Sequence, residues 1–162
     1  MLSFSVELNP KRPCRYVFKA YLWDKYKERF GDKFNVLIDT GAFNTIVHKA
    51  LVHRHGTMLK QTMITSVGGY TGESNLCILD KINIGGCVFE KVAALAVSFE
   101  GELKDHILLG ANVMNNWDFT LSRSKNSLTV SEQFPETTSK REYPYRYCFD
   151  NKGRIMALQE MS

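Results

Sequence analysis

The chain has 162 residues, of which 44% are hydrophobic and 23% charged, a balance that indicates one globular domain with a core and excludes a disordered chain. The net charge is only +4, and Lys and Arg are scattered along the chain with acidic residues among them, so charge gives nucleic-acid binding little support. No apolar stretch has the length of a membrane span and the N-terminus lacks a signal-peptide layout, so we expect no membrane partner and a cytoplasmic location.

Neither the cysteines nor the histidines form a strong metal-binding pattern. No Cys-x-x-Cys pair occurs, so we expect reduced, mostly buried thiols at Cys14, Cys77, Cys87 and Cys148. His53 and His55 flank Arg54, but no acidic or Cys partner stands at helical or hairpin spacing. We therefore predict no metal and no cofactor.

The first part of the chain predicts strands. Leu2, Phe4, Val6 and Leu8 alternate with polar residues, which is typical of a half-buried strand. Residues 16–23 are rich in aromatic and β-branched residues and predict a second strand. The charged residues 24–33 predict a long hairpin loop, and residues 34–39 predict the return strand.

One carboxylate ends that return strand. Val36, Leu37 and Ile38 are consecutive apolar residues, which indicates a strand covered on both faces. Asp39 follows directly, and a carboxylate at the end of a buried strand is costly unless something binds or uses it. Because Asp, Thr and Gly are also common turn residues, residues 39–41 alone are equally compatible with a polar turn.

The middle of the chain predicts a short helix and a hairpin. Residues 44–47 predict a short extended segment, and residues 49–55 predict a helix that ends at Gly56. Residues 58–65 and 73–79 predict two strands that flank a turn with three glycines at 66–72. An ordinary hairpin turn would have the same pattern.

The next segments predict further strands and a second short helix. Ile82–Gly86 predicts a strand running into a tight turn, and residues 88–97 predict another strand before a polar loop at 99–105. Residues 106–110 predict a short apolar strand and residues 111–117 a short helix. A hairpin then follows, with strands at 119–121 and 127–130.

Several of these segments resemble the retropepsin-like aspartic proteases. Asp39 to Ala42 is similar to their Asp-Thr-Gly-Ala active-site loop, and the glycine-rich turn at 66–72 resembles the flap that closes over substrate. Residues 82–89 resemble the hairpin after the flap in bacterial members, and residues 112–121 resemble the family's helix and final hairpin. The resemblance covers residues 16–130 and implies an all-β fold, a retropepsin-like acid-protease barrel with one or two short helices.

The resemblance also implies the site residues. Asp39 is the expected catalytic residue. The expected support of the active-site loop comes from Thr40, Gly41, Ala42, Leu108, Leu109 and Gly110, where Leu-Leu-Gly resembles the segment that passes behind the loop. The expected substrate-binding flap residues are Ser66, Val67, Gly68 and Gly69.

The chemistry of this family requires two carboxylates around one water. Only Asp39 is followed by Thr-Gly; the sequence after it has no second copy, because Thr-Gly is missing after Asp80, Asp105, Asp118 and Asp150. A homodimer that brings Asp39 from each subunit to the two-fold axis would complete the site. Thr40 would then hydrogen-bond across the pair.

The chain ends are the candidates for joining the subunits. We expect a retropepsin-like domain at residues 1–130, followed at 131–162 by a linker and a β-hairpin with strands at 145–149 and 154–158. Retropepsins usually join their subunits with terminal strands, so residues 2–8 and this hairpin could form the dimer. Two edge strands that cap one core are an equal alternative.

The predicted function is an aspartic endopeptidase that acts on a peptide or protein substrate. Ala42 stands where many pepsin-like sites carry Ser or Thr, and loss of that hydroxyl removes a hydrogen bond to the ionised carboxylate. The apparent pKa values of the pair should rise, so we expect activity at mildly acidic to near-neutral pH. The alternatives are a catalytically silent homodimeric scaffold, a peptide-binding module, and a metal-dependent hydrolase that uses His53 and His55.

Overall fold

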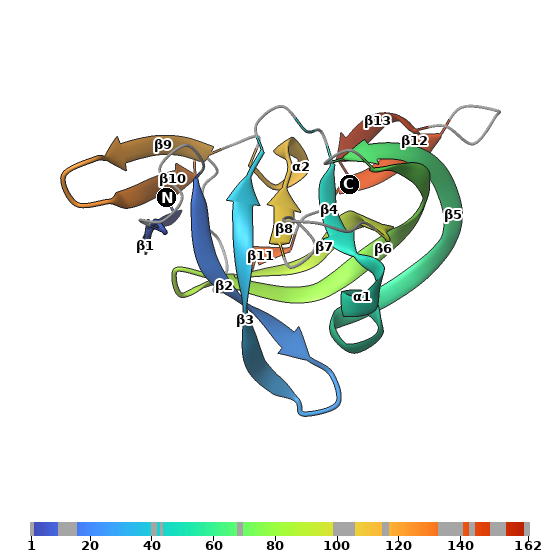
Figure 1. Cartoon of the computed structure of the whole chain (residues 1–162), viewed down its shortest axis with the longest axis horizontal. Helices are drawn as coiled ribbons and strands as arrows, with labels where there is room; N and C mark the ends of the chain where they lie inside the picture. Colours follow the sequence, from blue (N-terminus) through green and yellow to red (C-terminus); the bar gives the residue numbers. More distant parts are fainter. Residues whose placement is uncertain are drawn as a thin grey trace.

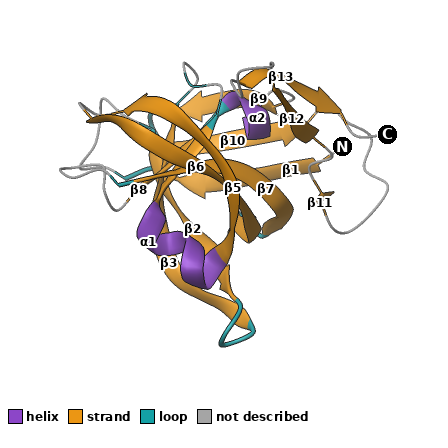
Figure 2. Ribbon diagram, turned by 90° about the vertical axis from the view of Figure 1, so that its right-hand side faces the viewer, coloured by secondary structure: helices purple, strands orange, loops and turns teal. Residues whose placement is uncertain are grey.

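A computed structural model of the chain describes residues 2–9, 16–39, 42, 44–67, 70–98, 106–114, 117–132, 141–142, 145–149 and 155–160. Strands dominate these ranges, with two short helices among them (Figures 1 and 2). The strands are β1 (Leu2–Glu7), β2 (Val17–Asp24), β3 (Arg29–Ile38), β4 (Thr45–His48), β5 (Gly56–Val67), β6 (Tyr70–Ile84), β7 (Cys87–Val97), β8 (His106–Leu109), β9 (Trp117–Ser122), β10 (Ser127–Glu132), β11 (Arg141–Glu142), β12 (Tyr145–Phe149) and β13 (Ile155–Glu160). The helices are α1 (Lys49–His55) and α2 (Ala111–Met114).

The central sheet closes on itself. Its strands follow the order β11-β7-β4-β8-β3-β2-β6-β5, and β6 also pairs with β7. This extra pairing joins β7, β4, β8, β3, β2 and β6 into a ring, and Figure 2 shows β5, β6 and β7 curving around the molecule. The predicted all-β barrel with one or two short helices is therefore confirmed.

The longest strand, β6, makes this closure possible. Its first part pairs with β5, its second part with β7, and Leu22 of β2 pairs with Ile82 near its end. The prediction of separate strands at 73–79 and 82–84 is wrong, because β7 pairs with β6 along both stretches. Gly85 and Gly86, with φ angles of 59° and 89°, then form the tight two-residue turn into β7.

The turn between β2 and β3 is shorter than predicted. Charged residues 24–33 suggested a long loop, but the two strands pair as far as Asp24 and Arg29. Trp23 and Phe30 pack edge to face across the strands, with ring centroids 5.3 Å apart. This aromatic pair supports continued pairing through residues whose charges had suggested a loop.

The core lies inside the barrel and continues beneath the smaller sheet β1-β10-β9. Phe4 of β1, Phe89 of β7 and Trp117 of β9 pack against one another, with ring centroids 5.4 to 6.1 Å apart. Trp117 was expected in the helix at 111–117, but α2 ends at Met114 and Trp117 begins β9. The indole is 6% exposed, so packing against the two Phe rings accounts for the earlier end of the helix.

The remaining local predictions are largely confirmed. Helix α1 spans the predicted residues and ends at Gly56, and the side chain of His48 caps its N-terminus by accepting a hydrogen bond from the Ala50 N–H. Cys77 and Cys87 are free, and burial raises the pKa of the Cys77 thiol to about 12. The predicted polar loop at 99–105 lies outside the described residues.

The chain ends form two separate small sheets. β1 pairs with β10 at the edge of the three-stranded sheet, and β12 pairs with β13 as the predicted C-terminal hairpin. The expected linker at 131–142 is only partly described: β10 continues to Glu132, and Arg141 and Glu142 form β11 beside β7. The roles of both termini in joining subunits and the proposed domain boundary at 130 stay predictions.

Candidate active site

Asp39 directly follows β3, which lies between β2 and β8 in the sheet (Figure 1). Pairing on both edges fixes the end of this strand, and Val36 within it is completely buried. Asp39 itself is half-buried, so its carboxylate stands at the boundary between the barrel and solvent. Such a position lets a carboxylate act on a bound molecule.

The backbone around Asp39 is held by the segment that was predicted to support it. The Asp39 N–H donates to the carbonyl oxygen of Leu109 at 3.0 Å, and the Ala111 N–H donates to the carbonyl oxygen of Ala42 at 2.8 Å. The Ala42 N–H also donates to the Asp39 carbonyl at 3.1 Å, which closes a tight loop. Thr40 and Gly41 lie inside this loop but outside the described residues.

Gly110 allows two segments to meet behind the loop. A Cβ atom at this position would overlap the carbonyl carbon and oxygen of Asn44 and lie 2.8 Å from the Thr45 nitrogen. Leu108 and Leu109, which precede it, are buried and pair with Leu37 and Ile38 of β3. The structure thus brings together the predicted Leu-Leu-Gly segment and Asp39.

A buried polar network next to this contact was not predicted. Asn112 Oδ1 accepts hydrogen bonds from the Thr45 N–H at 2.9 Å and the Thr45 hydroxyl at 2.8 Å, and Asn112 Nδ2 donates to the Ala93 carbonyl at 2.8 Å. The Gly110 N–H donates to Thr45 Oγ1 at 3.1 Å. One amide therefore ties β4, β7 and α2 together beside the Asp39 loop. From the sequence, Asn112 was included only as the first residue of the stretch that resembles the family's helix and final hairpin, and neither the burial of its side chain nor its need for partners was predicted.

The predicted flap lies at the tip of a long hairpin. β5 and β6 pair as far as Ser66 with Thr71 and Val67 with Tyr70. The predicted flap residues Gly68 and Gly69 connect these strands and lie outside the described residues. The arrangement of a paired hairpin with a two-residue connection is compatible with the expected flap and with an ordinary turn.

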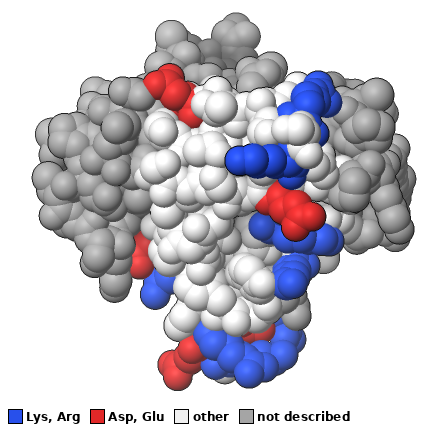
Figure 3. All heavy atoms as spheres, turned by 90° about the vertical axis from the view of Figure 1, so that its left-hand side faces the viewer, with Lys and Arg blue, Asp and Glu red and all other residues white. Residues whose placement is uncertain are grey.

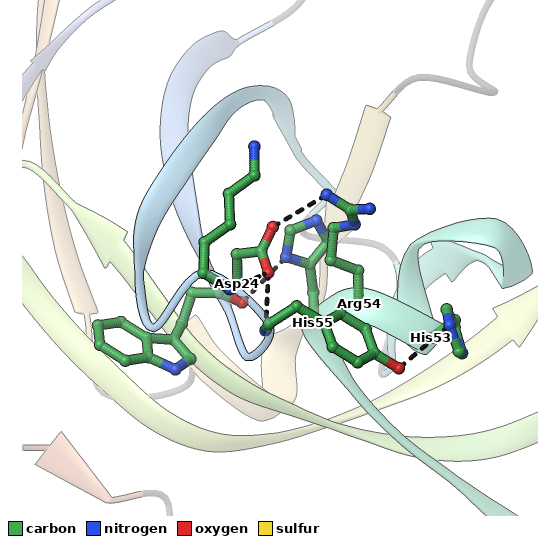
Figure 4. A network of polar contacts seen from close by, with 7 residues as sticks. Asp24, His53, Arg54 and His55 are labelled. Atoms are coloured by element: carbon green, nitrogen blue, oxygen red, sulfur yellow. Dashed lines mark hydrogen bonds and ion pairs between the residues drawn. The ribbon is translucent and has the colours of Figure 1, made fainter.

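The two candidate metal-binding histidines make separate contacts (Figure 4). His53 Nε2 lies 3.1 Å from the hydroxyl of Tyr26, whereas the buried His55 places Nδ1 2.9 Å from the Trp23 carbonyl oxygen. Within the described ranges, no group of three His, Cys, Asp or Glu side chains could hold a metal ion. The geometry gives the metal-hydrolase alternative no support.

The closed barrel, the Asp39 loop and the strand that holds it define a retropepsin-like aspartic protease. The family model described as "gag-polyprotein putative aspartyl protease" matches residues 30–116, which include β3, the β5–β6 hairpin and the Leu-Leu-Gly segment. Since the match covers more than half of the chain, the chain belongs to this family.

A solved structure shares the fold. The crystal structure of a retropepsin-like aspartic protease from Rickettsia conorii superposes with a TM-score of 0.52 at 17% sequence identity, covering 80% of this chain and 90% of that chain. No curated protein sequence gives a significant match. Among the described residues, no helix has the length and apolar character needed to cross a membrane.

Proposed function

We propose that this protein is an aspartic endopeptidase that is active as a homodimer, with Asp39 of each subunit forming the catalytic pair. The observation that carries the proposal is the placement of Asp39: it is half-buried at the end of β3, with its backbone fixed by Leu109 and its loop closed by Ala42. A backbone fixed in this way preorganises the residue that carries the reacting carboxylate. The family match supports the same reaction class.

The chemistry follows from two carboxylates in one place. Two carboxylates about 3 Å apart do not both ionise, so the pair shares one proton. The ionised Asp39 removes a proton from a water molecule, whose oxygen attacks the scissile carbonyl carbon. The protonated Asp39 donates a hydrogen bond to the carbonyl oxygen, and the pair later returns a proton to the leaving amine. No cofactor is required, because water is the nucleophile.

The rest of the site would serve substrate binding and assembly. Thr40 would hydrogen-bond across the two loops, and Gly41 would allow the substrate backbone to approach. The β5–β6 hairpin with residues 66–69 at its tip would cover an extended peptide, which could pair with it as an added strand. Ala42 carries no hydroxyl for the carboxylates, so we expect activity at mildly acidic to near-neutral pH. A pH–rate profile that peaks at strongly acidic pH would contradict this expectation.

The test is cleavage of a complex peptide pool, read by mass spectrometry at several pH values. We expect new cleavage sites with the unmodified protein and a loss of at least about a thousandfold in rate for Asp39→Asn, the size of an acid–base contribution. Asp80→Asn makes the same chemical change on β6, away from the loop, and should retain activity. Sedimentation of all three proteins shows whether they form equal amounts of dimer.

The main alternative is a retropepsin-fold homodimer that binds peptides without cleaving them. This alternative has the same fold and the same intact Asp39 as the proposed enzyme. Neither feature alone establishes turnover. It predicts peptide binding without products from either the unmodified protein or Asp39→Asn. If folded dimers of both proteins leave the peptide pool with the same set of masses, the proposed enzyme is contradicted and the scaffold is favoured.

A further inference from the structure

A groove lies on the outer face of the β2–β3 hairpin. It has a volume of about 580 Å³ and runs between the end of β1, the two hairpin strands and the β6–β7 turn. Lys19 pairs with Asn35 and Tyr21 pairs with Lys33, so these four side chains share one face of the sheet as two cross-strand pairs.

The base of this groove carries two lysine side chains. Lys19 and Lys33 are exposed, and among the described residues no carboxylate lies within ion-pair distance of either ammonium group. The Lys33 ammonium lies 5.7 Å from the ring centroid of Tyr21, which is 36% exposed. In Figure 3, Lys and Arg side chains gather at the β2–β3 turn and continue upward along one side of this face, with an acidic side chain among them.

The walls of the groove are polar rather than basic. Glu7, at the end of β1, faces the same groove, and Asn83 shapes the opposite wall by accepting a hydrogen bond from the Gly86 N–H at 3.0 Å. A polyphosphate backbone would meet repulsion from Glu7, because its charges are closely and evenly spaced. A polypeptide with separated carboxylates can place them on the two lysines and its apolar or polar residues on Tyr21 and Glu7.

We propose that this groove binds an acidic segment of the polypeptide substrate, outside the bond that is cleaved. The proposal rests on the proposed endopeptidase function. Asn35 lies on β3, four residues before Asp39, so the Cα atoms of the two residues are about 13 Å apart at about 3.3 Å per residue. An extended chain spans this distance with about four residues, so one substrate can occupy both places.

Binding is measured separately from cleavage with the Asp39→Asn protein. The probe is a short fluorescein-labelled peptide with two Glu residues separated by Ser residues, compared by fluorescence anisotropy with the same peptide carrying Gln in place of Glu. We expect the acidic peptide to bind more tightly, and Lys19→Gln combined with Lys33→Gln to weaken it about tenfold. Lys49→Gln combined with Lys60→Gln removes the same charge outside the groove and should change affinity less than about twofold.

Glu7→Gln provides a gain-of-binding control. Removing this negative charge should strengthen binding of the acidic peptide and leave the Gln peptide unchanged. Equal affinity for the two peptides, or an equal loss in both lysine pairs, would overturn the proposal. Tighter binding of a single-stranded oligonucleotide through Lys19 and Lys33 would overturn it in favour of a nucleic-acid site.

Cleavage assays separate this proposal from the proposed function. If the unmodified protein cleaves neutral and acidic peptides equally and the groove variants behave the same, the groove proposal fails and the protease stands. If the acidic peptide binds through Lys19 and Lys33 but no peptide is cleaved, the groove stands and the protease proposal fails.

Discussion

Two polar networks secure the two ends of β3, and they are built from different chemistry. Beside its C-terminal end, uncharged Asn112 and Thr45 join β4, β7 and α2 next to Asp39. Beyond its N-terminal end, Asp24 binds Arg54 at 3.2 Å and ties the β2–β3 turn to α1 (Figure 4). The first network is buried throughout, whereas the Arg54 side chain in the second is 46% exposed.

This difference predicts where stability is concentrated. A buried neutral network cannot exchange its lost partners for water, so removal of one member leaves unsatisfied donors and acceptors. The exposed guanidinium of Arg54 can be replaced by water, and Asp24 Oδ1 still accepts hydrogen bonds from the Tyr26 and Lys27 N–H groups. The end of β3 that carries Asp39 should therefore be the more sensitive to substitution.

The largest expected effect comes from Asn112→Ala. It removes both hydrogen bonds from Thr45 and the one to the Ala93 carbonyl, and it leaves a cavity. We expect the free energy of unfolding to fall by about 3–4 kcal/mol, measured by urea denaturation at one protein concentration.

Two conservative changes test whether hydrogen bonding is the cause. Thr45→Ser keeps the hydroxyl and should cost much less than Thr45→Val, which removes it. Asn112→Ala and Thr45→Val combined should cost less than the sum of the two, because both remove the hydrogen bond from the Thr45 hydroxyl to Asn112 Oδ1. Additive effects would contradict the shared network.

The next largest effect is expected from Gly110→Ala. The new Cβ atom would overlap the Asn44 backbone, and backbone atoms cannot move aside as a side-chain end can. We expect a loss of about 2–3 kcal/mol in the free energy of unfolding and a larger relative loss of peptidase activity, because the carbonyl of Leu109 would shift from the Asp39 N–H. Gly31→Ala, on β3, introduces a Cβ where nothing lies within 4 Å and at a position without a positive φ, so it is the matched control. Equal effects of both changes on activity would show that the contact at Gly110 does not position Asp39.

The sequence predicted most of the fold because its signals were local. The strand of Val36 to Ile38, helix α1 and the C-terminal hairpin follow from periodicity and turn residues. The errors came from tertiary contacts: the Trp23–Phe30 pair extends a strand through charged residues, and Trp117 leaves the predicted helix to pack on Phe4. No local pattern contains these contacts.

The site was predicted less completely than the fold. The position of Asp39 beside Leu109 was predicted from the Asp-Thr-Gly-Ala and Leu-Leu-Gly motifs, which occur in the same order as in the family that the sequence resembles. The pairing of Thr45 with Asn112 joins residues 67 positions apart, and each residue alone is unremarkable in the sequence. A second subunit adds contacts that one sequence cannot specify, so the pairing of two Asp39 side chains stays a prediction.

The smallest expected effect comes from Asp24→Asn. Unlike the effects above, it should depend on pH. Burial alone would raise the pKa of Asp24, but the N–H groups of Lys27 and Tyr26 and the Arg54 guanidinium together hold it below the ordinary value of 3.8. A lowered folded-state pKa contributes stability that is present above pH 3.8 and is lost as the pH falls through the folded-state value. Asp24→Asn should therefore lower the melting temperature at neutral pH, and the difference from the unmodified protein should shrink below pH 3.8, because there the carboxyl loses its charge as well. Asn112→Ala provides the contrast, since its network is neutral and its destabilisation should stay constant across the same pH range. A constant difference for Asp24→Asn would show that the charge of Asp24 does not stabilise the turn.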